Sequence, residues 1–520
     1  MNPRKLLGGP AIVAYLALVK LLVHLGTARV YGFFTDELYF LACGEHLDWG
    51  YVDMPPLTAF QAWLTRALFG DAPESIRLFP ALAGAALVLL TGALVRALGG
   101  GRFAQGLTAL AVVIAPVYLA FDSYLSMNSI EPLLWMGCAW VLIRMIQTGE
   151  VRLWLAFGAL AGIGLENKHT MLLFGFALVA GLLLTPERRL LANRWLPLGG
   201  LIAFNLFLPN LLWNLAHHFP FFELLRNIRE DGRDVQFSPL QFLALQAVLV
   251  FPLSFPLWTG GLLRLLANRE ARPYRALGWA YLIALGVLLL THGKVYYLAP
   301  AYSMLLAAGA VSLEERLRRL RSLRTPAPRA ERWLKPALAT GLLLTGALFA
   351  PTALPILPPE TYLRYTEALG IAQPKIENRG TGPMPQLFAD RFGWKEMAET
   401  VARVYHALPE GERQRTAIYA NDYGEGGAID YYGPTLGLPK AIGGHVSYWL
   451  WGPRAYTGET LIVLGDDSEG IDRHFEEVHE VAEIGHPYAM RQEHFTLYLC
   501  RKPKGWRSLQ EIWPRLKEFH

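Results

Sequence analysis

The chain has 520 residues, of which 53% are hydrophobic and 18% are charged. Soluble domains carry about 25% charged residues, so this composition predicts a membrane protein. The net charge of +5 is small for this length, which argues against nucleic acid as a partner and leaves the basic residues as an orientation signal.

Apolar segments of membrane-spanning length follow one another from residue 10 to residue 353. A span needs about 20 apolar residues, and about 17–25 are tolerated. We expect about eleven spans, although 152–166 and 169–185 are short and could form one broken hairpin. The expected spans are 10–30, 77–97, 104–121, 129–147, 152–166, 169–185, 195–213, 239–264, 276–292, 296–313 and 336–353.

Lysine and arginine residues concentrate in alternate loops between these spans. With a cytoplasmic N-terminus, about 21 of them lie in inner loops and about eight in membrane-side outer loops. The inner group includes Arg4, Lys5 and a dense run from Arg316 through Arg324 to Lys335. The positive-inside rule therefore predicts a cytoplasmic N-terminus. The N-terminal segment has no small-residue cleavage site, so we expect the first span to be retained, in what we predict to be a bacterial inner membrane. The predicted outer segments, in a periplasm or extracellular space, are 31–76, 214–238 and 375–520.

The last part of the chain has the composition of a soluble α+β domain. The fold class that we predict is an all-α polytopic membrane bundle over 1–353, a linker over 354–374 and a soluble α+β domain over 375–520. Within that domain, 392–408 has helical periodicity, and 416–420, 459–464 and 495–499 resemble strands. The glycines of 423–428 lack the Lys-Ser/Thr of a phosphate-binding loop, so we expect a strand-to-helix turn there.

Two adjacent carboxylates, Asp36 and Glu37, directly follow the first span. Charges beside hydrocarbon are costly, so a cluster of them predicts a functional site, although single acids and aromatics also mark the membrane interface. The cluster continues with Tyr39, Glu45, Asp48, Tyr51 and Asp53. Apolar residues through 39–47 and 57–68 favour two helices lying flat in the interface.

Other chemistry-bearing residues lie in the predicted outer loops. Lys168 and Lys294 run against the positive-inside rule, so they either snorkel to headgroups or bind an anion such as phosphate. His217 and His218 are either ordinary loop histidines or, with a carboxylate such as Asp53, ligands of a divalent metal ion. A carboxylate base beside phosphate-binding cations suits transfer from a phosphorylated lipid donor to a nucleophile.

Four motifs in order resemble the bacterial family-39-like glycosyltransferases of the GT-C class, which include protein mannosyltransferases, the lipid A aminoarabinose transferase and the rhizobial lipopolysaccharide glycosyltransferases. The motifs are Asp36-Glu37, Tyr51-x-Asp53-x-Pro55-Pro56-Leu57, the stretch 164–170 around Lys168, and the stretch 294–302 that contains Lys294 and Tyr297. The resemblance covers most of residues 1–350.

The resemblance implies an inverting enzyme that moves a sugar from a polyprenyl-phosphate donor to a lipid, glycan or protein hydroxyl. It implies Asp36 as general base with Glu37 in support, and Lys168, Lys294 and Tyr297 as ligands of the donor phosphate. It also implies Tyr39, Tyr51 and Asp53 in the substrate loop, and Asp53 with His217 or His218 as a metal site. Two departures stand out: Met54 replaces a basic residue of the aminoarabinose transferase, and Asn128 replaces an acid that Glu131 could supply.

Two other classes of function remain open from the sequence. A secondary transporter also has about a dozen spans, but such proteins carry internal repeats and mid-membrane charges, and no repeat is evident here. A membrane-anchored glycan-binding protein would use 375–520 for recognition and the spans as an anchor.

Overall fold

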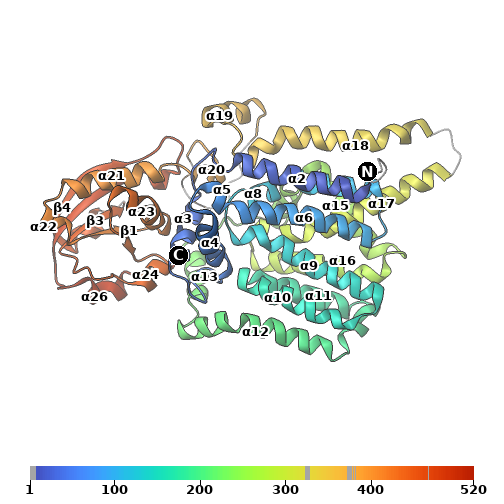
Figure 1. Cartoon of the computed structure of the whole chain (residues 1–520), viewed down its shortest axis with the longest axis horizontal. Helices are drawn as coiled ribbons and strands as arrows, with labels where there is room; N and C mark the ends of the chain where they lie inside the picture. The colour runs from blue at the N-terminus through green and yellow to red at the C-terminus, as the bar shows by residue number, and fades with distance from the viewer. Residues whose placement is uncertain (1–7, 323–327, 372–377, 379, 381, 466–467) are drawn as a thin grey trace. The chain divides into compact units, whose positions relative to one another are not determined.

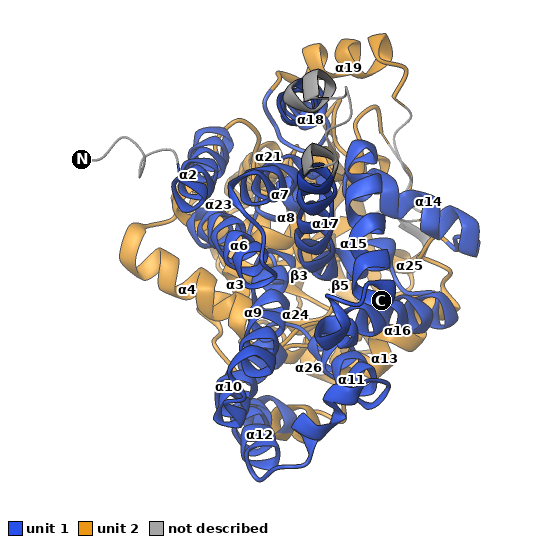
Figure 2. Cartoon of the chain, turned by 90° about the vertical axis from the view of Figure 1, so that its right-hand side faces the viewer, with its two compact units in different colours: residues 1–28, 77–211, 236–356 blue, residues 29–76, 212–235, 357–520 orange. Residues whose placement is uncertain are grey.

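The computed structural model describes residues 8–322, 328–371, 378, 380, 382–465 and 468–520. Arg4, Lys5 and Arg324, which contributed to the predicted orientation, lie outside the described residues. The chain divides into two compact units, coloured separately in Figure 2. Unit 1 comprises 1–28, 77–211 and 236–356, and unit 2 comprises 29–76, 212–235 and 357–520.

Unit 1 is a bundle of apolar helices, many of which run side by side in Figure 1. α2 packs on α6, α6 on α9, α11 on α16, and α15 on α17. The principal helices are α2 (Gly9–Thr27), α6 (Leu78–Ala97), α7 (Arg102–Ile114), α8 (Pro116–Phe121), α9 (Met127–Thr148), α10 (Trp154–Asn167), α11 (Thr170–Leu183), α12 (Trp195–Ala216, which runs on into unit 2), α14 (Pro239–Leu249), α15 (Phe255–Ala267), α16 (Arg275–Thr291), α17 (Tyr302–Ser322) and α18 (Pro328–Phe349).

Among the described residues, seven helices are long and apolar enough to cross a membrane, or eight if one bent pair is counted as a span. The predicted count of about eleven is therefore not confirmed, although each predicted span contains a helix. Several of these helices are short or broken. α7 ends at Ile114 just before Pro116, α10 and α11 have 14 residues each, and α14 and α15 form the bent pair, at an angle of 96°.

Small residues bring the helices of unit 1 close together. A Cβ added to Gly261 of α15 would overlap the carbonyl of Leu305 in α17, and one added to Gly309 of α17 would overlap the carbonyl of Leu257 in α15. Helices in membranes associate through such contacts, because lipid provides no hydrophobic drive between them. The multi-pass helical fold expected from the sequence is confirmed.

Unit 2 contains a five-stranded mixed sheet of order β2-β1-β3-β5-β4. β1 runs parallel to β2 and β3, whereas β5 is antiparallel to β3 and β4. The strands are β1 (Thr416–Ala420), β2 (Ile442–Gly443), β3 (Thr460–Gly465), β4 (Phe475–Ile484) and β5 (Phe495–Pro503). The predicted helix and all three predicted strands are present, with the helix as α21 (Trp394–Ala407), so the α+β class is confirmed.

The remaining helices of unit 2 surround that sheet or come from the two segments nearer the N-terminus. They are α3 (Thr35–Glu45), α4 (Leu57–Phe69), α5 (Pro73–Ile76), α13 (Pro220–Glu230), α19 (Pro359–Ala368), α20 (Gln386–Ala389), α22 (Glu410–Arg413), α23 (Tyr423–Leu436), α24 (Ser447–Trp451), α25 (Ser468–Asp472) and α26 (Leu509–Ile512). α3 and α4 are the two helices expected after the first span. α4 exposes Phe60, Trp63 and Leu68, so its place in the interface stays a prediction.

We expected a strand-to-helix turn at the glycine-rich stretch 423–428. In the structure this stretch is instead the beginning of helix α23. Asp422 caps this helix by accepting the backbone N–H of Gly424 at 2.7 Å, and Glu425 accepts the backbone N–H of Asp422 at 3.2 Å. A capping box of this kind starts a helix in spite of the low helix propensity of glycine.

Candidate active site

Asp36 and Glu37 both lie in the first turn of α3, where the helix dipole favours negative charge. Their environments differ. Glu37 is fully buried, and its Oε2 accepts the backbone N–H of Phe34 at 2.9 Å, which caps the helix. Asp36 is partly exposed, and its Oδ1 accepts a hydrogen bond from the hydroxyl of Tyr423 at 2.8 Å. Of the two acids, Asp36 is therefore the one placed to meet a substrate.

Tyr39 and Asp53 form a second hydrogen-bonded group within unit 2. The buried Tyr39 hydroxyl lies 2.8 Å from Asp53 Oδ1 and 2.7 Å from Ser447 Oγ, and the Ser447 hydroxyl oxygen also accepts the backbone N–H of Val52 at 3.3 Å. Part of the Asp53 side chain reaches solvent, yet desolvation by the surrounding protein raises the pKa of this carboxyl to about 6. The Asp53 carboxyl therefore stays protonated to a higher pH than an ordinary aspartate does.

Tyr51 secures the loop between α3 and α4. Its side chain is buried, and its hydroxyl lies 3.0 Å from the carbonyl of Cys43 and 3.1 Å from that of His46. The same oxygen accepts the backbone N–H of Asp48 at 3.2 Å. These contacts hold the C-terminal end of α3, whereas Asp36 lies in the first turn of that helix.

His445 supports Tyr423 from a neighbouring loop. Its Nδ1 lies 3.1 Å from the backbone nitrogen of Tyr423 and 3.3 Å from Asp422 Oδ2, and its Nε2 lies 2.8 Å from the carbonyl oxygen of His520. Burial works against a charged imidazole, but the hydrogen bond and charge of Asp422 outweigh it and raise the pKa of His445. His445 thus ties the start of α23 to the end of the chain.

The histidines predicted as metal ligands are held by other contacts. His217 stacks on Trp213 at 4.1 Å, and its Nδ1 lies 2.8 Å from the carbonyl oxygen of Trp213. The Trp213 indole in turn donates to Asp48 at 2.8 Å, and His218 is exposed. In the part of the chain that the structure describes, no group of three His, Cys, Asp or Glu side chains could hold a metal ion. Asp53, His217 and His218 as they lie here do not fit a metal site.

In unit 1, four of the predicted site residues come together: Lys168 lies at the centre, and Asn128, Glu131 and Tyr297 surround it. The ammonium Nζ of Lys168 donates to Asn128 Oδ1 at 2.7 Å and pairs with Glu131 Oε2 at 3.2 Å. It also lies 4.4 Å from the ring centre of Tyr297. Lys168 and Glu131 are both buried, and Glu131 accepts a further hydrogen bond from Thr170. The cluster forms because the end of α10, the start of α9 and the turn 295–301 meet in this unit.

Lys294 lies directly before that turn, η5 (Val295–Ala301). Its carbonyl accepts the backbone N–H of Tyr297 at 3.0 Å, and its side chain is partly exposed. Lys294 and Tyr297 therefore belong to one local structure, as their spacing in the sequence suggested.

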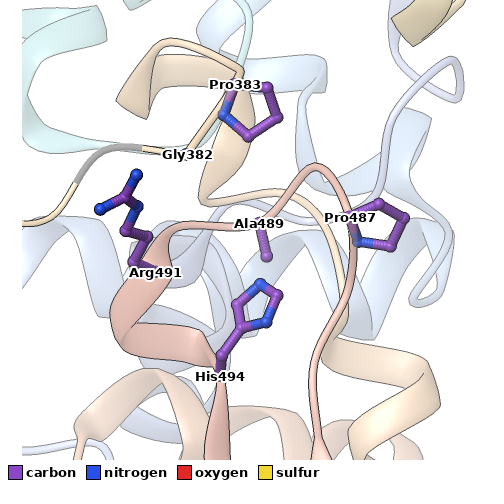
Figure 3. A pocket seen from close by; sticks show the side chains of 6 residues that line it. All are labelled: Gly382, Pro383, Pro487, Ala489, Arg491 and His494. Carbon is purple, nitrogen blue, oxygen red and sulfur yellow. The ribbon is translucent and has the colours of Figure 1, made fainter.

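A separate cavity of ≈ 420 Å³ lies in unit 2, lined by Gly382, Pro383, Pro487, Ala489, Arg491 and His494. Figure 3 shows Arg491 and His494 on one short stretch of chain, beside the turns that contain the two prolines. The cavity includes none of the residues predicted from the sequence.

Three residues around Asp36 and Tyr39 were not predicted to belong to the site: Tyr423, His445 and Ser447. The sequence offered two indirect signals, the glycines of 423–428 and the aromatic stretch 443–452. Aromatic side chains in such a stretch can either stack on sugars or form a core. Tyr448 is buried and donates to Asp430 at 3.0 Å, so it belongs to the core.

Comparisons with known proteins agree with this architecture. Residues 53–213 match the family model described as dolichyl-phosphate-mannose-protein mannosyltransferase. No curated protein matches the chain in sequence.

The chain shares its fold with a number of solved structures, including the following three. The structure of ArnT from Cupriavidus metallidurans bound to undecaprenyl phosphate has a TM-score of 0.61 at 14% identity, over 94% of this chain and 97% of that one. The mycobacterial arabinofuranosyltransferase AftD has a TM-score of 0.53 at 16% identity, over 95% of this chain and 40% of that one. The Archaeoglobus fulgidus oligosaccharyltransferase tethered to an acceptor peptide has a TM-score of 0.50 at 14% identity, over 80% of this chain and 62% of that one.

At these identities the structures establish the fold, whereas the matched segment connects the chain with a glycosyltransferase family. The multi-pass helical architecture and the α+β domain agree with the structural matches, and the motif around Lys168 lies within the segment 53–213. The chain has the fold of the GT-C glycosyltransferases, and the match over 53–213 supports the class predicted from its motifs, a membrane glycosyltransferase.

Proposed function

We propose that this protein is an inverting glycosyltransferase that moves a sugar from a polyprenyl-phosphate donor to an acceptor hydroxyl at the outer face of a bacterial inner membrane. The acceptor is a lipid, a glycan or a protein. The observation that carries the proposal is the position of Asp36, a partly exposed carboxylate at the start of a buried helix, oriented by a tyrosine hydroxyl.

In this reaction Asp36 acts as general base. It takes the proton from the acceptor hydroxyl while that oxygen forms a bond to the anomeric carbon. The bond between the anomeric carbon and the phosphate oxygen breaks, and its electron pair leaves with the polyprenyl phosphate. Attack opposite the leaving group inverts the anomeric configuration. Glu37 is assigned a supporting role, since it caps the helix that carries Asp36.

The donor phosphate is assigned to Lys168, Lys294 and Tyr297 of unit 1. A lysine ammonium is a point-charge partner for phosphate, and a tyrosine hydroxyl can donate to it. The buried Lys168 is already held by Asn128 and Glu131, so the phosphate would compete with Glu131 for the ammonium. The undecaprenyl phosphate bound to the structurally similar ArnT supports a lipid phosphate as the leaving group. No step is assigned to a metal ion.

The test is a comparison of envelope lipids, glycans and proteins by mass spectrometry in a host strain that lacks the gene. We expect a sugar to be missing in that strain and restored by the wild-type gene. An Asp36→Asn variant should express and insert normally but leave the sugar missing, since positioned general bases contribute about 10²–10⁴-fold to rate.

The matched control is Asp71→Asn, which removes an exposed carboxylate of the same unit that pairs with Arg66. This variant should restore the sugar fully. Full restoration by Asp36→Asn would exclude Asp36 as the base, and an unchanged envelope in the deletion strain would argue against glycosyl transfer to these acceptors.

A further inference from the structure

The hydrogen bond between Tyr423 and Asp36 joins residues that are 387 positions apart in the chain. Asp36 belongs to the loop after the first membrane helix, whereas Tyr423 begins helix α23 of the α+β domain. Both lie within unit 2, and the 2.8 Å distance is short enough for a strong hydrogen bond to a carboxylate.

Tyr423 is held in place from several directions. Its ring centre lies 5.0 Å from that of Tyr39 and 5.0 Å from that of His445. Its backbone N–H is directed at His445 Nδ1, and Asp422 caps the helix at the preceding position. The hydroxyl that reaches Asp36 therefore comes from a side chain with little freedom to move.

Glycines explain how α23 comes near enough to α3. A Cβ added to Gly427 would lie 2.5 Å from the carbonyl carbon of Leu38 and 2.8 Å from the backbone nitrogen of Tyr39, and one added to Gly424 would overlap the Thr35 hydroxyl. Real Cβ atoms do not approach backbone this closely. The glycines on this face of α23 thus let it pack directly on the backbone of the helix that carries Asp36.

We propose that Tyr423 is a positioning residue for Asp36, and that the α+β domain is therefore a required part of the catalytic machinery rather than a separate recognition module. By donating to Oδ1, Tyr423 fixes the orientation of the carboxylate and favours its ionised form, which is the form that accepts a proton. This inference rests on the proposed function for the role of Asp36, and on the structure for the contact.

The contact itself can be tested without any assay of activity. Thermal unfolding in detergent is measured for the wild type, for Asp36→Ala, which removes the acceptor oxygens, for Tyr423→Phe and for the double variant. We expect each single variant to lower the Tm and the double variant to lower it by clearly less than the sum of the two. Additive shifts would mean that the two side chains do not interact, which would overturn the inference.

The functional role is tested by the rate and pH dependence of transfer, with the lipid-linked donor extracted from host membranes and the product identified in the envelope comparison. Tyr423→Phe should lower kcat about ten-fold or more and leave the KM for the donor unchanged. It should also move the acidic limb of the pH–rate profile to higher pH, because the lost hydrogen bond favoured the carboxylate. The other titratable side chains packed around Tyr423 are Tyr39, Asp422 and His445. The wild type and Tyr423→Phe share all three, so a difference between their pH profiles comes from the lost hydroxyl.

Tyr431→Phe is the matched control, because it removes a hydroxyl from the same helix, one that donates to the Asp71 carbonyl at 2.9 Å. It should change neither kcat nor the pH profile. If Tyr423→Phe behaves like this control while Asp36→Asn is inactive, the positioning role is excluded and the proposed function survives. If Asp36→Asn is active, the proposed function fails, and the positioning role fails with it.

Discussion

At the scale of single residues, Lys168 combines a structural ion pair with the phosphate-binding role that we propose for it. Its ammonium lies in a largely buried setting, where Glu131 balances its charge at 3.2 Å. Removing one partner of a buried pair leaves the other charge uncompensated, which costs about 3–5 kcal/mol, whereas removing both costs far less. The two functions of Lys168 can therefore be separated by substitution.

We expect Lys168→Gln and Glu131→Gln each to lower the free energy of unfolding by about 3 kcal/mol, and the double variant to recover most of that loss. Binding of undecaprenyl phosphate, followed by native mass spectrometry, should be lost in both proteins without Lys168. It should be strengthened in Glu131→Gln, because the competing carboxylate is gone. Normal binding by the double variant would show that Lys168 does not hold the phosphate.

Asp53 predicts a pH dependence of stability. Folding raises the pKa of its carboxyl from 3.8 to about 6, mainly by desolvation. The protonated form is therefore favoured in the folded state, and the associated stabilisation is present below about pH 4 and is lost as the pH rises through about 6. Asn at this position keeps an oxygen that can accept from Tyr39 but does not titrate.

The stability of the wild type relative to Asp53→Asn should accordingly fall by about 2 kcal/mol between pH 4 and pH 7. This change in stability is smaller than the full pKa shift would give, because the Asp53 side chain is partly exposed and solvent screens its charge. Thermal unfolding of both proteins across this range measures the difference. Parallel curves would show that Asp53 keeps an ordinary pKa in the folded protein.

Residue-level prediction succeeded for residues that the motifs marked, even where they lie far apart in the sequence, and failed for residues outside those motifs. Asn128, Glu131, Lys168 and Tyr297 come from helix ends and a turn that the motifs marked, and they do meet. Tyr423 was missed, because nothing local in its sequence indicates a partner 387 positions away. A hydrogen bond formed by tertiary packing leaves no periodic pattern to detect.

At the scale of elements, α23 shows tertiary packing overriding propensity. Its glycines weaken the helix by about 1 kcal/mol each relative to alanine, yet they permit contact with α3. From the sequence alone, glycines without the Lys-Ser/Thr of a phosphate-binding loop predicted a strand-to-helix turn. Strand β4 was missed for a comparable reason, since it lies at the edge of the sheet and is rich in glutamate, which is typical of edge strands but not of strands in general.

Gly427→Ala should therefore destabilise the protein by about 1–3 kcal/mol and lower transfer activity, because the new methyl group meets the backbone of Leu38 and not a flexible side chain. Gly411→Ala is the control, since no atom lies within 4 Å of its added Cβ. That variant should be neutral or slightly more stable. Thermal unfolding compares the two, and an unperturbed Gly427→Ala would contradict the close packing of α23 on α3.

At the scale of the whole molecule, the hydrophobic pattern identified the helices well but not how many of them cross the membrane. Length and apolar composition define a span, and α7, α10 and α11 are too short by that measure. The number of crossings and the side of each loop then depend on how broken helices are arranged in the bilayer. The distribution of basic residues supplies the independent prediction of sidedness, with 148–151 inside and 375–520 outside.

This orientation can be measured by labelling single cysteines, because the three native cysteines, Cys43, Cys138 and Cys500, are all buried and free. Glu150 and Gln414 are exposed, and they lie in segments predicted on opposite sides. In intact spheroplasts, a membrane-impermeant maleimide should label Gln414→Cys at once. It should label Glu150→Cys only after the membrane is permeabilised.

The wild-type protein provides the background, which should be low in both conditions since a buried thiol reacts slowly. Labelling of both variants in intact spheroplasts would rule out the predicted arrangement, and the reverse pattern would place the α+β domain in the cytoplasm. In that case Asp36, which contacts this domain, would face nucleotide-linked sugars, and a lipid-linked donor would no longer be required by location. The orientation thus determines which donor chemistry the carboxylate can serve.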